Sequence, residues 1–117
     1  MDKESFKALI FGMAAFTTIT RGKWRAGEES DPAAAIEKHC ADMAKLIVLT
    51  PEQEGFLILA LPSGFKMHPP AVELLRFSAS QAAHAADMIE DGGSEPEIMA
   101  RLQDTLTSLI DKVAARG

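Results

Sequence analysis

The chain has 117 residues, of which 47% are hydrophobic and 25% are charged, and its formal net charge at pH 7 is −5. This length predicts one domain with enough apolar surface for a core, and the composition excludes a disordered chain. A net negative charge is the opposite of the basic surface of nucleic-acid-binding proteins, so no nucleic-acid partner is expected.

The N-terminal apolar stretch is too short to cross a membrane. Residues 8–20, ALIFGMAAFTTIT, carry no charge but span only thirteen positions, whereas a membrane-spanning helix needs about 20. The preceding MDKESFK has balanced charges, whereas a signal peptide begins with a positive segment. Cys40 is the only cysteine and has no intramolecular disulfide partner. We therefore expect a cytoplasmic protein without a membrane partner.

The first helix is predicted over residues 3–20. Phe6, Ile10 and Met13 fall on one face at helical spacing, and neighbouring apolar residues widen that face, so the helix should be largely buried. The β-branched residues 17–20 are poor helix formers and should weaken its end. The following RGKWRAGEES, residues 21–30, is expected to be a loop.

A second helix is predicted over residues 32–49. Ser30 or Asp31 is a suitable N-cap, and Pro32 suits the first turn of a helix. Apolar residues then recur at steps of four, three and four, as they do on one face of a helix.

The stretch LIVLTPEQEGFLILAL, residues 46–61, is compatible with a β-hairpin or with a helix end followed by a new helix. Thr50 as N-cap, Pro51 in the first turn and Gln53 at the third position form a capping box. A hairpin would need a turn signal such as Asn-Gly, which is missing. The sequence favours a helix over residues 51–61, apolar on nearly every side, which belongs in the middle of the fold or under a partner.

Two further helices are predicted over residues 70–91 and 95–115. Gly92 is a suitable left-handed cap for the first, and Ser94 with Glu97 predicts a capping box for the second. The short turn between them predicts an antiparallel αα-hairpin. The expected fold is an all-α, single-domain bundle of four to five helices. If residues 14–24 and 46–61 were strands instead, the fold would be α+β.

The apolar surface exceeds what a small bundle is expected to enclose, which predicts a contact with another protein, foremost a homodimer. Trp24 lies among three cations, a combination common at binding hot spots, although it is also suited to anchoring a loop on the core. The last helix carries an apolar repeat that fits either core packing or a partner. The residues predicted to bind a partner are Phe11, Trp24, Leu102, Leu106, Leu109 and Val113.

An acidic cluster offers an alternative site. Between Asp87 and Glu97 there are five carboxylates and no basic residue, and three of them lie at a helix C-terminus, where negative charge is unfavourable. A divalent cation or a basic partner would relieve this repulsion, and so would water. The weak candidates for metal ligands are His84, Asp87, Asp91 and Glu95.

No motif for catalysis or for a cofactor is present. His39 and Cys40 are neighbours, so on a helix their side chains diverge by about 100° and do not form a nucleophile pair. Acidic residues follow His84, which argues against phosphotransfer. The sequence therefore favours a non-catalytic protein that binds protein, as a regulator, adaptor or chaperone-like factor. The alternative is a small-molecule-binding or metal-binding helical protein, or a small enzyme, that uses the acidic cluster.

Overall fold

The computed structural model describes residues 1–61 and 68–116, and within these ranges it contains five α-helices and no strand. The helices are α1 (Lys3–Arg25), α2 (Pro32–Ala44), α3 (Pro51–Ala60), α4 (Pro70–Glu90) and α5 (Glu95–Ala114). The predicted all-α bundle is therefore confirmed, and the hairpin alternative for residues 46–61 is wrong.

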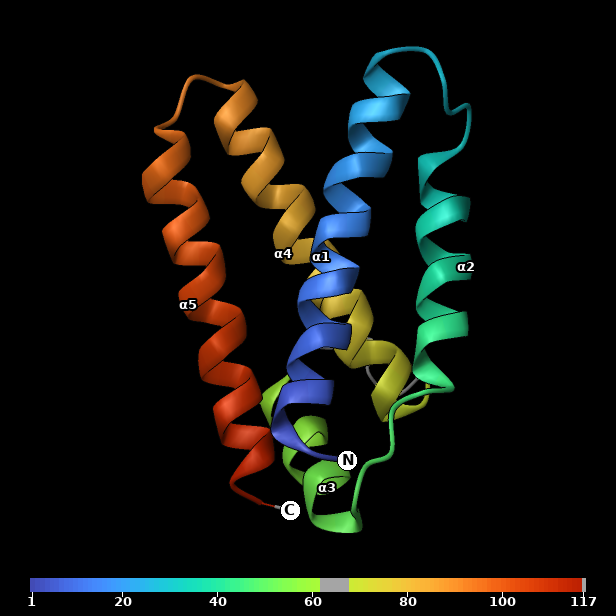
Figure 1. The fold of residues 1–117 in the computed structure, drawn as a ribbon, viewed down its shortest axis with the longest axis vertical. Helices are drawn as coiled ribbons and strands as arrows, with labels where there is room; N and C mark the ends of the chain where they lie inside the picture. The colour runs from blue at the N-terminus through green and yellow to red at the C-terminus, as the bar shows by residue number, and fades with distance from the viewer. Residues whose placement is uncertain (62–67, 117) are drawn as a thin grey trace.

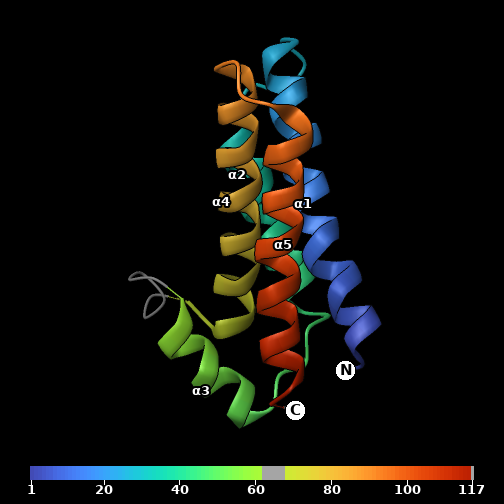
Figure 2. The ribbon, with the colours of Figure 1, turned by 90° about the vertical axis from the view of Figure 1, so that its left-hand side faces the viewer.

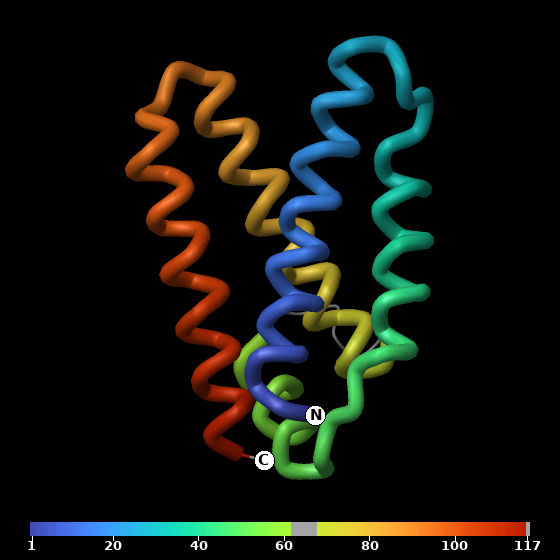
Figure 3. The backbone as a smooth tube through the Cα atoms, viewed as in Figure 1, coloured from blue at the N-terminus to red at the C-terminus, as the bar shows by residue number. Residues whose placement is uncertain are grey.

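The helices form two antiparallel pairs, α1 with α2 and α4 with α5, whose connecting loops lie at the same end of the molecule (Figure 1). α4 crosses behind α1 (Figure 3), and these two helices share the most extensive contact. α3 lies at the opposite end of the molecule, where both termini also lie, and packs on α4 and α5 (Figure 2). α1 is thus flanked by α2 and α5 and backed by α4.

The core lies mainly where α1, α4 and α5 meet, and α3 closes one end. Its largest fully buried apolar side chains are Ile10, Met13, Leu57, Leu74, Leu75, Leu106, Ile110 and Val113. Burying one such aliphatic side chain contributes about 1.5–3 kcal/mol to stability. Ser78 is also fully buried, and its hydroxyl donates to the carbonyl oxygen of Ile10 at 2.8 Å, so this polar group has a partner inside the core.

The first helix is longer than predicted. α1 continues to Arg25, so the predicted end near residue 20 is wrong, and so is the first half of the predicted loop over residues 21–30. The hydroxyl of Thr17 donates to the carbonyl oxygen of Met13 at 2.9 Å, which satisfies it without leaving the helix. Thr17 and Thr20 are buried in the bundle. Tertiary packing therefore outweighs the low helix propensity of this segment.

The second helix is shorter than predicted, since α2 ends at Ala44 instead of residue 49. The backbone N–H of Ile47 donates to the carbonyl oxygen of Ala44, three residues earlier, which tightens the chain as it leaves the helix. Ile47 is buried, whereas Val48 is exposed. The chain then approaches Pro51, which disfavours a helical conformation at Thr50.

The predicted capping box of α3 is confirmed. The Thr50 hydroxyl accepts from the Gln53 backbone N–H at 3.1 Å, and Oε1 of Gln53 accepts from the Thr50 backbone N–H at 2.9 Å. α3 nevertheless buries only Leu57 and leaves Ile58 and Leu59 52% and 89% exposed. A position in the middle of the fold, one of the two alternatives expected for this helix, is therefore wrong.

The predicted αα-hairpin of α4 and α5 is confirmed. Gly92 has a φ of 98°, the left-handed conformation expected of a glycine at a helix C-terminus. Ser94 is the N-cap residue of α5, but its side chain makes no capping hydrogen bond, so the predicted capping box with Glu97 is wrong. The turn is held instead by backbone bonds, including one from the Gly93 N–H to the Met88 carbonyl oxygen.

Candidate functional site

The acidic end of α4 faces the basic end of α1. The guanidinium of Arg21 forms an ion pair with Asp87, and Arg25 pairs with Glu90 at 2.6 Å. A carboxylate at an exposed helix C-terminus is unfavourable by about 0.3–1 kcal/mol, and a cation beside it offsets that repulsion. Two features that are separate in the sequence, RGKWR and the acidic cluster, thus meet as one structural contact between α1 and α4.

The weak metal-ligand candidates do not converge. In residues 1–61 and 68–116, no three His, Cys, Asp or Glu side chains lie where they could hold one metal ion. Asp87 is paired with Arg21, whereas His84, Asp91 and Glu95 are exposed to solvent. These four described residues therefore do not form a common metal-binding site.

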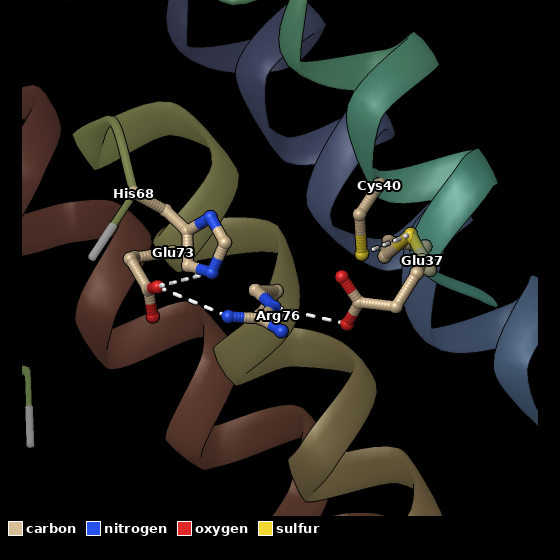
Figure 4. Close-up of polar contacts among 6 residues, drawn as sticks. Glu37, Cys40, His68, Glu73 and Arg76 are labelled. Atoms are coloured by element: carbon tan, nitrogen blue, oxygen red, sulfur yellow. Dashed lines mark hydrogen bonds and ion pairs between the residues drawn. The ribbon is translucent and has the colours of Figure 1, made fainter. Parts of the chain in front are cut away.

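A second polar network connects α2 to α4 (Figure 4). Nε of Arg76 donates to Glu37 at 2.9 Å and Nη1 donates to Glu73 at 3.3 Å. The hydrogen bond with Glu37 is the main reason why the pKa of Arg76 is raised. Nε2 of His68 lies 4.0 Å from Glu73. Because Arg76 bridges two carboxylates of its own chain, this network fastens one helix to the other.

Cys40 lies beside this network (Figure 4) but is not activated by it. The side chain is fully buried, with Sγ 3.7 Å from Sδ of Met13. Burial, and then the negative charge of Glu37, raises the pKa of the Cys40 thiol to about 11. The thiol is therefore protonated near neutral pH, a poor nucleophile and a poor metal ligand. The neighbouring His39 stacks on the ring of Phe16, with centroids 3.8 Å apart.

An open groove lies between α1 and α5, with a volume of about 560 Å³. We call it the α1/α5 groove. The two helices lie side by side in Figure 1. Its lining is mostly apolar, from Ala8, Phe11, Ala14, Ala15, Met99 and Leu102. Its polar residues are Glu4, Lys7, Thr18 and Gln103. An apolar floor with polar residues around it is the usual composition of a protein-binding surface.

The residues predicted to bind a partner do not lie on one common surface. Phe11 and Leu102 line the α1/α5 groove. Leu106 and Val113 lie in the core, and Leu109 packs against it partly buried, so the last helix turns most of its apolar seam inward. Trp24, in the last turn of α1, is 49% exposed.

Sequence reasoning missed Ala8, Ala15 and Met99 as lining residues of the groove. Alanine is common on both buried and exposed helix faces, so the two alanines gave no signal. Met99 belongs to the apolar repeat of the last helix, which fits core packing or a partner equally, and the residue is 42% exposed. Only the position of α5 beside α1 reveals that these residues share a surface.

Comparison of the chain with known protein families, with curated proteins and with solved structures finds no match in any of the three. Among the described residues, no helix combines the length and the hydropathy needed to cross a membrane.

Proposed function

We propose that this chain is a non-catalytic protein that acts by binding another protein through the α1/α5 groove. The observation that carries the proposal is the lining of the groove, which consists mostly of apolar residues from two helices. Surfaces of this kind bind the apolar face of a helix or an extended segment of a partner.

The chemistry around the groove supports binding over catalysis. Its ionisable residues are Glu4, which is exposed, and Lys7, which is partly buried. The one thiol of the chain, Cys40, is buried and protonated. General acid–base or nucleophilic chemistry needs such groups at hydrogen-bond distance from a reacting atom. The groove instead provides a concave apolar surface, which is suited to binding a protein partner.

Site-specific photocross-linking in the native cell tests this proposal. A photoreactive amino acid replaces Ala15 in the groove, and a matched variant carries it at Ser80, which is exposed on α4. We expect discrete cross-linked products at Ala15 and none of them at Ser80. If Ala15 gave no product above the Ser80 background, the groove would not be a protein-binding surface.

A further inference from the structure

The outward side of α1 is not covered by any described helix. α4 lies behind α1, and α2 and α5 lie to its sides, while the remaining side faces solvent (Figures 1 and 2). Exposed residues follow this side at alternating steps of three and four, namely Ser5, Ala8, Gly12, Ala15, Ile19 and Gly22. We call these six residues the α1 outer face. Ala8 and Ala15 also line the α1/α5 groove, so the two surfaces are continuous.

One large apolar residue stands on this face. Ile19 is 58% exposed, although an isoleucine is among the residues most often buried in folded proteins. Together with the half-buried Phe11 and the exposed Met99 of the groove, it extends the apolar surface toward the C-terminal half of α1. A surface of this extent along one helix suits another helix as its occupant.

Resting on the proposed function, we infer that the partner is a second copy of this chain, whose α1 packs antiparallel against the α1 outer face. Charge is the first reason. The first turn of α1 carries Glu4 and the last turn carries Lys23. The other charged residues of these two turns, Lys3 and Arg25, already form ion pairs within the chain. An antiparallel copy brings the last turn of each helix to the first turn of the other, whereas a parallel copy places like charges together. Among the described residues, neither Glu4 nor Lys23 takes part in an ion pair within the chain.

Shape is the second reason. An antiparallel two-fold pair centred between Met13 and Ala14 places Ile19 of one copy opposite Ala8 of the other. It also places Gly12 opposite Ala15. The one large side chain of the face thus meets a small one on the partner, and the centre contains only small residues, which permits close approach of the two helices.

The glycine at position 12 is consistent with close packing of a second α1 helix against this face. A glycine inside a helix destabilises that helix relative to alanine. A Cβ atom built on Gly12 meets nothing within 4 Å, so packing within this chain does not require a glycine there. The backbone of a second helix lying against this face would require a small residue at this position.

Disulfide cross-linking tests the arrangement directly. If Ala8 faces Ile19 of the other copy, the two Ala8 positions are about 16 Å apart along the helix axis, from a rise of about 1.5 Å per residue. A disulfide needs Cα atoms within about 7 Å. Cys40 does not interfere, because it is buried and protonated. The variants are Ala8→Cys and Ile19→Cys, each prepared alone, with Ser80→Cys on α4 as the matched exposed control.

We expect mild oxidation to produce a mixed disulfide when Ala8→Cys and Ile19→Cys are combined, at least tenfold faster than dimers form from either variant alone or from Ser80→Cys. Rapid cross-linking of Ala8→Cys with itself would indicate parallel packing and overturn the inference. The same rate in all samples would reflect random collision and would overturn it too.

The oligomeric state gives an independent readout. Light scattering during size-exclusion chromatography should show a dimer of the unmodified chain, and Gly12→Leu should raise the dimer dissociation constant at least tenfold. Because a side chain at Gly12 has open space in this chain, Gly12→Leu should keep the helix content unchanged. A monomer at all concentrations, or a Gly12→Leu dimer as tight as the unmodified one, would overturn the inference. The proposed function would still stand if Ala15 cross-linked to a different protein.

Discussion

Leu106 offers the sharpest test of how the last helix packs, because a leucine seam on α5 fits either a core or a binding surface. The structure buries Leu106 completely, whereas Leu59 on α3 is 89% exposed. Leu106→Ala removes three carbon atoms, worth about 2.4 kcal/mol at about 0.8 kcal/mol per buried carbon. The cavity left behind adds to this, so we expect a total loss of about 3–4 kcal/mol in the free energy of unfolding.

The assay is urea unfolding followed by circular dichroism. It is run at two protein concentrations, so that an effect of the substitution on association can be told apart from its effect on folding. A chain of this length should have a total stability of roughly 6–18 kcal/mol, and the loss should lower Tm by about 12–16 °C. Leu59→Ala is the matched control and should change stability by less than about 0.5 kcal/mol. A cost below about 1 kcal/mol for Leu106→Ala, or an equal cost for Leu59→Ala, would refute the placement of α5.

Three further predictions concern contacts between helices. Gln53→Glu keeps an acceptor for the Thr50 N–H but removes the donor that reaches the Val113 carbonyl oxygen at 3.2 Å. The substitution should therefore lower the free energy of unfolding by about 1–2 kcal/mol and raise the rate of amide hydrogen exchange in α3. An unchanged exchange rate in α3 would contradict the hydrogen bond between Gln53 and Val113. A double-mutant cycle on Arg21 and Asp87 should give a coupling of about 0.5–1 kcal/mol that shrinks in 1 M salt; a coupling that salt does not change would argue against an exposed ion pair. The raised pKa of Cys40 means that the unfolded chain loses this proton first, so stability should fall as pH rises from about 9 to about 11, by up to ~3 kcal/mol. Tm measured across this range should fall less steeply in Cys40→Val, and identical slopes would contradict burial of the thiol.

The sequence by itself determined most of the local structure. Thr50, Pro51 and Gln53 specify the start of α3, because the capping box uses only atoms within four residues. Gly92 specifies the end of α4 in the same way, through its left-handed backbone. The apolar periodicity of the last two helices and the short turn between them were enough to predict an antiparallel pair.

The tertiary structure decided what periodicity leaves open. The RGKWR segment continues α1, and its Arg21 and Arg25 pair with carboxylates on α4, more than 60 residues further along the chain. The apolar α3 lies at an end of the bundle instead of its middle, since α1, α4 and α5 already fill the core.

The candidate site depends on tertiary structure in the same way. A helical repeat shows which residues share a face, but not whether that face meets another helix or solvent. Leu106 was therefore predicted as a partner contact, with core packing as the alternative, and it lies in the core, whereas Ala8 and Ala15 were not predicted and line the α1/α5 groove. The physical reason is that capping and helix periodicity act within a few residues, whereas burial depends on which helices pack together.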